Sequence, residues 1–232
     1  MIDIRPASQR GHANHGWLDS FHTFSFGEYF DTQQMGWGVL RVINDDTVVA
    51  GRGFGTHGHR DMEIMSYVLQ GELEHKDSMG TGSVIRPGDV QLMSAGTGVR
   101  HSEFNPSSTN PVHFLQIWIE PAFTGTRPSY QQRRFDVSAK RGRLQLIVSP
   151  DGRQDSLTLG QDARVYAALL DGQESISHPL DAGRRAYVHV AQGSLNLNGQ
   201  PMSAGDGAKV SDETVLVLDG GADAEVLLFD LP

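Results

Sequence analysis

Ser66-Tyr67-Val68-Leu69-Gln70-Gly71-Glu72-Leu73 has the pattern of an apolar strand, a Gln-Gly turn and a second strand. A similar segment, Tyr187-Val188-His189-Val190-Ala191-Gln192-Gly193-Ser194-Leu195, occurs later in the chain. A Gly-Asp pair follows each copy after a short gap, at Gly88-Asp89 and at Gly205-Asp206. We therefore predict two copies of one β unit, with the boundary in the Arg-rich stretch from Gln131 to Arg143. Chance similarity among glycine-rich turns is the alternative explanation.

Short segments rich in Val, Ile, Leu, Phe and Tyr recur on both sides of that boundary, separated by Gly, Pro, Asp or Asn. They predict strands at Trp37 to Asn44, Glu63 to Leu69, Val112 to Ile119, Leu144 to Val148, Arg164 to Leu170 and Val226 to Phe229. Many short strands between turn residues are typical of an all-β sandwich or barrel. Because no long amphipathic helical pattern competes with them, the predicted fold class is all-β.

Composition and charge exclude several classes of protein. The 232 residues include 27 glycines, which indicates many tight turns. Lys and Arg number 19 and Asp and Glu number 28, so the formal net charge of −9 disfavours direct binding to nucleic acid. No apolar run approaches the roughly 18 residues of a membrane helix, and no secretory pattern opens the chain, so we expect a cytoplasmic location without membrane attachment. The sequence has no cysteine, so any metal must be held by His, Asp or Glu.

Two pairs of ligand-type residues share the same spacing. His57 and His59 are two positions apart, and so are His101 and Glu103. Alternate side chains of an extended strand share a face, so each pair can point to one side. On neighbouring strands the two pairs would form a cup of three imidazoles and one carboxylate. That donor set suits a divalent transition metal and leaves coordination positions for substrate or dioxygen.

Three further histidines, His12, His15 and His22, lie near the start of the sequence with irregular spacing. They either line the mouth of a pocket and assist proton transfer or have a structural role fixed by hydrogen bonds. The aromatic residues beside them are expected in the core rather than in a substrate platform; these are Trp17, Phe21, Phe24 and Phe26.

The spacing of individual residues also resembles the two motifs of the cupin superfamily. The first motif is matched by Gly51, His57, His59, Glu63 and Gly71, and the second by Gly96, Gly98, His101 and Asn105. Longer stretches are similar to the pirin family, above all to its bacterial quercetin 2,3-dioxygenase members. These stretches are GHANHGWLDSFHTFSF at residues 11–26, MSAGTG at 93–98 and QQRRF at 131–135.

The resemblance to pirins implies a bicupin, in which two cupin β-barrels are stacked and only the N-terminal barrel binds metal. We therefore expect a metal-binding cupin over residues 1–135 and a C-terminal cupin without the ligand set over residues 136–232. Aligning the two repeats on their glycines supports this asymmetry. The alignment puts Pro179, Asp181 and Arg185 where the first copy has His57, His59 and Glu63.

The fourth metal ligand differs between the two resemblances. Ordinary cupins use the carboxylate at the position of Glu63, whereas pirins use the one at the position of Glu103, and strand parity permits either choice. We predict Glu103, which completes the set with His57, His59 and His101. Glu63 would then orient a ligand imidazole or serve as a hydrogen-bonded acid that lines the barrel.

By resemblance, the predicted activity is that of quercetin 2,3-dioxygenase, which opens the heterocyclic ring of quercetin or a similar flavonol with O2 and releases carbon monoxide. Glu103 would accept the flavonol hydroxyl proton as a base in addition to binding metal. The alternative function is that of a non-catalytic, metal-containing pirin that regulates through a protein partner.

The expected cofactor is one divalent transition metal ion, with iron first and Cu, Ni, Co, Mn or Zn as alternatives. Zinc would argue against oxygen chemistry because it has no redox role. The expected partners are a flavonol-like small molecule and O2, a protein partner is left open, and a monomer is expected.

Overall fold

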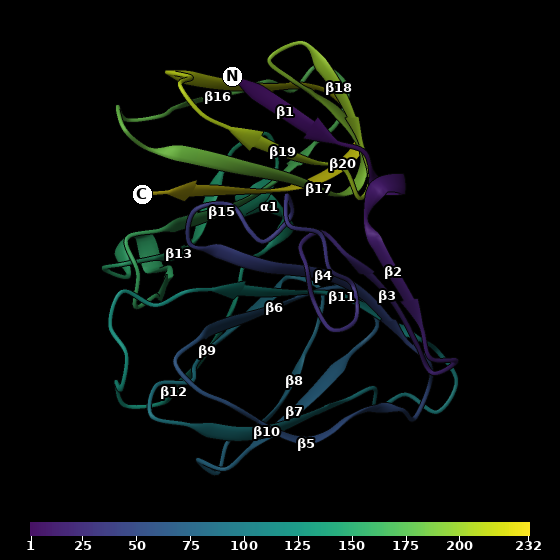
Figure 1. The fold of residues 1–232 in the computed structure, drawn as a ribbon. Helices are drawn as coiled ribbons and strands as arrows, with labels where there is room; N and C mark the ends of the chain where they lie inside the picture. Colours follow the sequence, from purple (N-terminus) through teal and green to yellow (C-terminus); the bar gives the residue numbers. More distant parts are fainter. The chain divides into compact units, whose positions relative to one another are not determined.

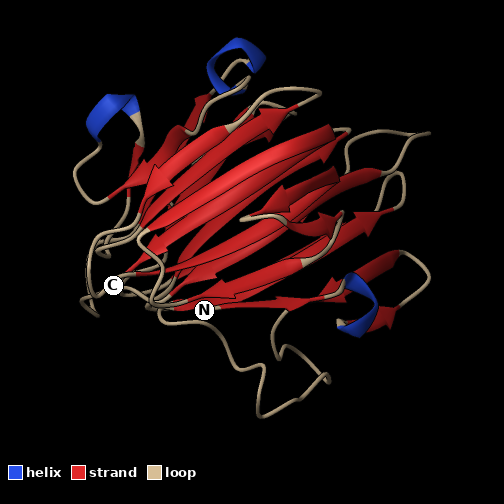
Figure 2. Cartoon of the chain, turned by 90° about the horizontal axis from the view of Figure 1, so that it is seen from above, coloured by secondary structure: helices blue, strands red, loops and turns tan.

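The computed structural model describes all residues from Met1 to Pro232, and it is built almost entirely of β-strands (Figures 1 and 2). The predicted all-β class is therefore confirmed. The chain divides into two compact units. The N-terminal unit contains Gly11–Arg134 and Leu159–Gln161, and the C-terminal unit contains Met1–Arg10, Phe135–Thr158 and Asp162–Pro232.

The N-terminal unit has eleven strands, all of them paired antiparallel. They are β2 (Gly11–Asn14), β3 (Leu18–His22), β4 (Leu40–Val48), β5 (Gly53–His59), β6 (Glu63–Gln70), β7 (Leu73–Asp77), β8 (Gly82–Ile85), β9 (Asp89–Ser94), β10 (Val99–Phe104), β11 (Val112–Ile119) and β12 (Ser129–Arg134). One sheet has the order β12-β9-β6-β11-β4-β3-β2 and the other the order β5-β10-β7-β8. An apolar core joins the two sheets, with Phe114 and Val48 from the first and Leu73 and Ile85 from the second.

Strand β6 shows why these segments are extended. Its sequence EIMSYVLQ is buried at every position except the last, and it lies between β9 and β11 in the sheet. Its apolar residues occupy both faces of the strand, which is typical of strands covered on both sides, and the buried Glu63 and Ser66 have hydrogen-bond partners. The predicted strand at Val112 to Ile119 is present as β11 with the same bounds.

The predicted strand at Trp37 to Asn44 is shifted in the structure. Trp37 and Leu40 face each other across a tight turn, in which Gly38 has a φ of 56°, so β4 begins at Leu40. It continues to Val48 through Asn44, Asp45 and Asp46, which pair with β11. Those polar residues resemble a turn in the sequence, but they remain in the strand because their side chains have polar partners inside the unit.

The C-terminal unit is one sheet of nine strands. They are β1 (Ile2–Arg5), β13 (Gln145–Ser149), β14 (Leu157–Thr158), β15 (Arg164–Leu170), β16 (Ile176–Pro179), β17 (Arg185–Leu197), β18 (Gln200–Ser203), β19 (Gly207–Val210) and β20 (Val215–Leu231). The order is β1-β19-β17-β20-β15-β13-β14, with β16 also on β20 and β18 also on β17. Short helical segments occur at η1 (Ala7–Gln9), α1 (Val137–Lys140) and η2 (Arg153–Asp155).

Two segments belong to a different unit from the one that a boundary at residue 135 would give them. Strand β1 pairs with β19, with Ile2 opposite Val210 and Ile4 opposite Ala208, and both isoleucines pack on the C-terminal core. The short segment Leu159–Gln161 lies with the N-terminal unit. A repeat alignment cannot reveal this exchange, because it does not show which sheet edge receives a terminal strand.

The two copies of the repeat contain the same type of turn. The Asp89 carboxylate accepts a hydrogen bond from the Arg86 backbone N–H at 2.9 Å, and the Asp206 carboxylate accepts the matching bond from Ser203 at 2.8 Å. The glycine before each aspartate has a positive φ, 93° and 83° respectively. The Gly-Asp pairs therefore recur because both copies close the same turn.

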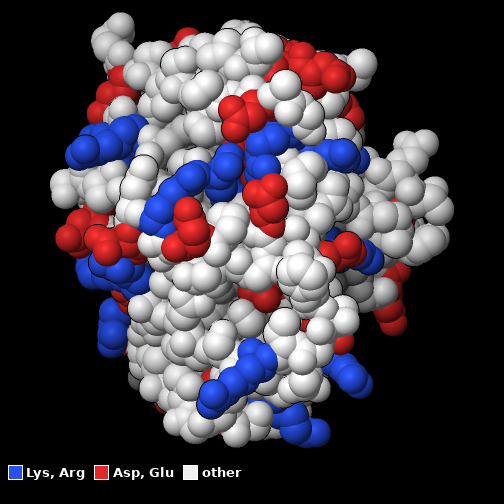
Figure 3. All heavy atoms as spheres, turned by 90° about the vertical axis from the view of Figure 1, so that its left-hand side faces the viewer, with Lys and Arg blue, Asp and Glu red and all other residues white.

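The surface carries charges of both signs. Figure 3 shows Lys and Arg side chains next to Asp and Glu side chains over one face of the molecule. None of the helices has the length and apolar character needed to cross a bilayer.

Candidate metal centre and its cavity

The structure brings His57, His59 and His101 together. Both histidines of β5 lie beside β10, where His101 is directly opposite His57 and Val99 is opposite His59. The three ring centroids are 4.5 to 4.9 Å apart, and one ligand nitrogen from each ring lies within 4.8 Å of the others. Three imidazoles from two neighbouring strands therefore converge on one point.

The protonation of these rings suits metal binding. His57 Nδ1 lies 2.8 Å from the Gly55 carbonyl oxygen, which can only accept, so Nδ1 carries the proton and Nε2 is left with a lone pair. His101 Nε2 is buried and has no hydrogen-bond partner. Buried polar atoms are normally satisfied, so an orphaned imidazole nitrogen beside two other imidazoles fits a divalent transition metal.

Burial also keeps two of the rings neutral. It lowers the pKa of His59 to about 4 and that of His101 to about 3, and the neighbouring His57 lowers both further in the same direction. A neutral imidazole retains the lone pair that a metal needs.

Glu103 is buried next to this cluster, with 2% of its surface exposed. Its carboxylate accepts hydrogen bonds from Ser66 Oγ at 3.1 Å and from Gln116 Nε2 at 2.8 Å. A bulge between His101 and Glu103 sets Glu103 opposite Phe54 on β5. Glu103 belongs to a second group of potential ligands, in which its carboxylate, His75 and His101 lie within 4.8 Å of one another. Burial raises the pKa of Glu103 to about 7 although the Ser66 hydrogen bond opposes the shift.

Glu63 lies outside both groups of potential ligands. Its carboxylate accepts a hydrogen bond from Ser94 Oγ at 2.8 Å and another from the Gly160 backbone N–H. Burial raises its pKa, and these hydrogen bonds oppose the shift. Glu63 thus holds the segment Leu159–Gln161 against β6 in the N-terminal unit.

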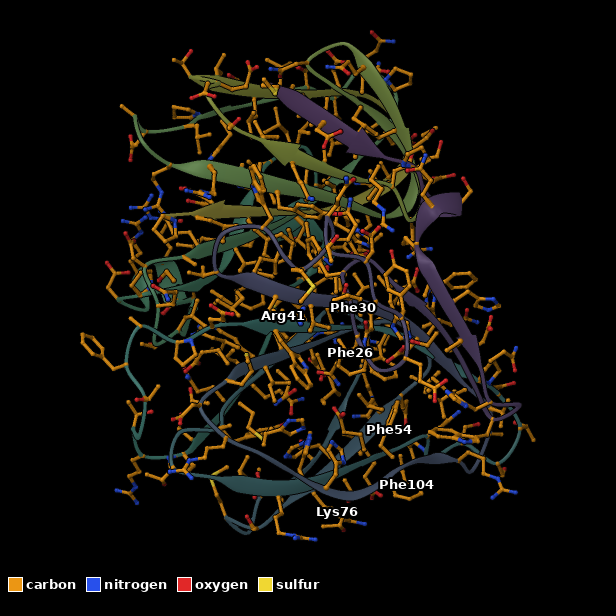
Figure 4. All side chains as sticks on the ribbon, in the orientation of Figure 1. Phe26, Phe30, Arg41, Phe54, Lys76 and Phe104 are labelled. Atoms are coloured by element: carbon orange, nitrogen blue, oxygen red, sulfur yellow. The ribbon has the colours of Figure 1, made fainter.

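A cavity of about 990 Å³ opens beside the histidines, and His57, His59 and Glu103 form part of its wall. Much of the remaining wall is aromatic. Figure 4 labels Phe26, on the loop between β3 and β4, and Phe54 on β5, both of which line the cavity. Trp118 makes an edge-on contact with His59 at 5.0 Å and with Phe26 at 5.4 Å. The cavity therefore offers flat apolar surfaces next to the imidazole cluster.

Polar side chains of β3, β4 and β11 form another part of the cavity wall. His22 Nδ1 donates to Asn44 Oδ1 at 2.9 Å, and Ser20 Oγ donates to the Asp46 carboxylate. Gln116 faces Asn44 across β11 and β4, and its buried Oε1 has no partner. All five residues line the cavity. Burial raises the pKa of Asp46 to about 7, against the effect of the Ser20 hydrogen bond.

The early histidines and aromatic residues divide between the two roles considered for them. His12, His15 and His22 all line the cavity. His12 stacks on Phe21 at 4.4 Å and donates to Asp19 at 2.6 Å. Phe24 is a core residue with 1% exposure, as expected. Trp17 is partly buried and packs on the core beside Leu18, as expected, but it also lines the cavity. Phe26 lines the cavity as well, which a core position alone does not describe.

Sequence reasoning missed His75 and Asp77 of β7. Their side chains are fully buried and 3.1 Å apart, and β7 pairs with β10 on the side away from β5. The signal was present, because His75-Lys76-Asp77 has the same alternation as His101-Ser102-Glu103. Neither of the two cupin motifs that predicted the ligands includes these residues.

In the C-terminal unit, the paired strands β16 and β20 contribute apolar side chains to a core instead of a group of metal ligands. On β16 and β20, Ile176 faces Leu218, and these side chains together with Leu216 belong to the apolar core. The connection from β16 to β17 has five residues against three between β5 and β6, so the alignment on glycines does not match β16 to β5 residue by residue. Both groups of potential metal ligands lie in the N-terminal unit.

Two families of sequences match this chain. Residues 3–119 match the Pirin family, and residues 146–231 match the quercetinase C-terminal cupin domain. Quercetin 2,3-dioxygenase of Escherichia coli strain K12 is 53% identical over 233 residues, with 100% of this chain and 99% of that protein covered. A pirin-like protein of Caulobacter vibrioides is 40% identical, with 99% of each chain covered.

A solved structure agrees with the sequence matches. The bacterial pirin YhhW from Escherichia coli, in complex with nickel(II), superposes with a TM-score of 0.95 at 51% identity, covering 100% of this chain and 99% of that one. The similarity thus extends over both units and includes the N-terminal unit that carries the imidazole cluster. A chain with these two β units and these matches belongs to the pirin family.

Proposed function

We propose that this protein is a metal-dependent dioxygenase that opens the heterocyclic ring of quercetin or a similar flavonol with O2 and releases carbon monoxide. The observation that carries the proposal is the group of three imidazoles beside an aromatic-lined cavity of about 990 Å³. Cavities of about 300 to 1,000 Å³ suit small organic ligands. The 53% identity to an Escherichia coli quercetin 2,3-dioxygenase supports the same reading.

We propose His57, His59, His101 and Glu103 as the metal ligands. Support comes from the convergence of the three rings, the unpartnered Nε2 of His101 and the buried carboxylate next to it. The nickel(II) complex of the related pirin supports a divalent ion, and iron remains our first expectation for the ion that sustains turnover. When bound, such an ion supplies a positive charge that polarises the hydroxyl and carbonyl oxygens of a hydroxy-ketone.

The side chains of the cavity suit a planar polyphenol. Phe26, Phe54 and Trp118 offer apolar faces and edges for fused rings, while Asn44 and Gln116 offer hydrogen bonds to hydroxyl groups. Glu103 faces the same space and is the group we propose to accept the proton of the reacting hydroxyl. Its hydrogen bonds to Ser66 and Gln116 hold the carboxylate in place for that transfer.

The overall reaction balances with O2 as the only oxidant. Both oxygen atoms of O2 enter the ring-opened ester, and one carbon of the heterocycle leaves as carbon monoxide. The aromatic side chains next to the imidazole cluster favour this outcome because they keep water away from the reacting oxygens.

The test is oxygen uptake with quercetin, measured on protein reconstituted separately with Fe(II), Cu(II), Ni(II), Co(II) and Mn(II). Each free metal is run in parallel because flavonols oxidise unaided. His101→Ala is the variant expected to lose uptake. His113→Ala is its matched control, since His113 lies on β11 in the same unit and bonds Asp45 instead of joining the cluster.

Uptake that needs both protein and metal, disappears in His101→Ala and is matched by carbon monoxide would support the dioxygenase and identify the competent ion. Full metal content and full turnover in His101→Ala would overturn the ligand assignment. If every metal binds tightly at one ion per chain and no uptake exceeds the free-metal controls, the regulatory alternative replaces this proposal.

A further inference from the structure

A chain of buried side chains extends from His101 away from the cavity. His101 Nδ1 lies 3.4 Å from His75 Nδ1, and His75 Nε2 lies 3.1 Å from Asp77 Oδ2. Strands β10 and β7 are paired so that His101 is directly opposite Asp77 and Glu103 is opposite His75. The side chains of His75 and Asp77 are both 0% exposed, so water does not replace these contacts.

The carboxylate at the end of the chain determines the direction of each hydrogen bond. Asp77 Oδ1 accepts from the backbone N–H groups of Met79 and Thr81 at 2.8 and 3.0 Å, which orients the group. Its Oδ2 accepts from His75, so His75 Nε2 carries a proton and His75 Nδ1 has a lone pair. His101 Nδ1 must then carry the proton that it donates to His75. The lone pair of His101 is therefore on Nε2, the buried nitrogen without a partner.

We propose that His75 and Asp77 are positioning residues, which fix the tautomer and the ring orientation of His101 so that its Nε2 faces the metal. This inference rests on the metal centre proposed above. Ligand histidines usually receive such help from a single carboxylate or carbonyl. The Gly55 carbonyl oxygen orients the ring of His57 directly, at 2.8 Å from Nδ1. The ring of His101 is instead oriented by Asp77 through the intervening His75.

His75 fits the role of a positioning residue better than that of a direct ligand. Its Nε2 is bonded to Asp77, and its Nδ1 lies at hydrogen-bonding distance from His101. Tyr130 covers the ring, with centroids 4.8 Å apart. Both nitrogens of His75 thus have partners within the protein.

Asp77→Asn tests the direction of the hydrogen bonds that join Asp77, His75 and His101. The backbone N–H groups of Met79 and Thr81 keep an oxygen on their side, so the new amide nitrogen faces His75. His75 Nε2 then has to accept, its Nδ1 donates to His101 Nδ1, and the proton of His101 moves to Nε2. The substitution should therefore leave a proton on His101 Nε2, the nitrogen that the metal needs, although it changes neither His101 nor the shape of the site.

The first readout needs no metal and no substrate. Long-range proton–nitrogen NMR of the histidine rings in the metal-free protein distinguishes the two tautomers, with His101→Ala used to assign the signals. We expect the Nδ1–H form of His101 in the wild type and the Nε2–H form in Asp77→Asn. An Nε2–H form in the wild-type protein would overturn the proposal even if the variant does not fold.

The second readout is the dissociation constant for nickel(II), measured by competition with a coloured chelator. We expect Asp77→Asn to bind nickel(II) about 10 to 100 times more weakly than the wild type. Asp45→Asn is the matched control and should keep wild-type affinity, because it alters the Asp45–His113 pair of the same unit. Wild-type affinity in folded Asp77→Asn would overturn the proposal.

The two proposals fail in different ways. If His101→Ala binds nickel(II) as tightly as the wild type, the proposed metal centre is wrong. If His101→Ala loses the metal while Asp77→Asn keeps both the wild-type tautomer and the wild-type affinity, only the positioning role is wrong. A loss of affinity in His75→Ala with no change in the His101 tautomer would identify His75 as a direct ligand and would also overturn the positioning role.

Discussion

Gly71 and Gly193 have the same role in the two units, because each has a positive φ and each lies against a backbone carbonyl group. Their φ angles are 78° and 68°. A Cβ at position 71 would lie 2.7 Å from the Pro111 carbonyl oxygen, and one at position 193 would lie 2.3 Å from that of Ala222. Both the backbone conformation and the lack of space require glycine at these positions.

Gly71→Ala should lower the free energy of unfolding by about 2 to 5 kcal/mol, from about 1 to 2 for the backbone conformation and about 1 to 3 for crowding. Gly80→Ala is the control, because Gly80 has a φ of 91° but no atom within 4 Å of the added Cβ. Urea unfolding of both variants separates the two contributions. Equal losses would show that the Pro111 contact costs nothing.

Asp46 should make stability fall as the pH rises. Burial raises its pKa from 3.8 to about 7, so between these values the native state binds more protons than the unfolded state. The contribution is complete at low pH and is lost as the pH rises towards 7. Asp46→Asn removes this titration, so its unfolding free energy relative to the wild type should increase by about 2 to 3 kcal/mol from pH 5 to pH 8.

Urea unfolding of both proteins at several pH values checks this prediction. Glu63 also has a raised pKa, but it is present in both proteins and largely cancels in the difference. The Asp46 charge helps to raise the pKa of Glu103, so the comparison is repeated with Glu103→Gln in both proteins. Parallel stability curves for the two proteins would contradict the prediction.

Glu103→Gln and Glu63→Gln distinguish the two candidates for the fourth ligand. Glu103→Gln keeps the shape of the side chain but removes the charge, so we expect weaker binding of nickel(II) and a kcat about 10² to 10⁴ times lower if Glu103 is the base. Glu63→Gln should keep the metal, because Glu63 bonds Ser94 and Gly160 outside the cluster. Loss of metal from Glu63→Gln alone would reverse the assignment.

Asp230→Asn should destabilise the C-terminal unit without affecting the metal. Asp230 is 2% exposed and accepts hydrogen bonds from Arg164 at 2.9 Å and from Arg184. Removing one charge of a buried pair costs about 3 to 5 kcal/mol, and the lower end applies here because Arg184 also bonds Asp162. Thermal unfolding and nickel(II) titration check the two halves of the prediction. A large loss of nickel(II) affinity in the folded variant would contradict it.

The local pattern of the sequence was sufficient to put His57 and His59 on one face of a strand. The side-chain period of a strand is two, so His57 and His59 had to share a face wherever β5 lay in the sheet. The neighbouring position of β10 came from the family resemblance, because no local pattern specifies which strands pair. For the same reason, His75 and Asp77 were missed although they lie directly behind His101.

Features that depend on distant contacts were harder to predict. Asn44, Asp45 and Asp46 resemble a turn until their partners on β3 and β11 are known. Trp17 and Phe26 are residue types common in cores, and only the tertiary structure shows that they also line a cavity. Strand β20 was predicted at Val226 to Phe229, but it extends from Val215 to Leu231 because bulges in its pairing with β17 let one strand continue through a glycine pair.

The pairing of β1 with β19 has a consequence for synthesis on the ribosome. Ala208 is made about 200 residues after its partner Ile4, which takes about 10 to 40 s at about 5 to 20 residues per second. During that time the whole N-terminal unit, including Leu159–Gln161, can fold while β1 waits as an unpaired strand. Its short sequence IDIR, with a charge at every second position, limits pairing with other nascent chains during the delay.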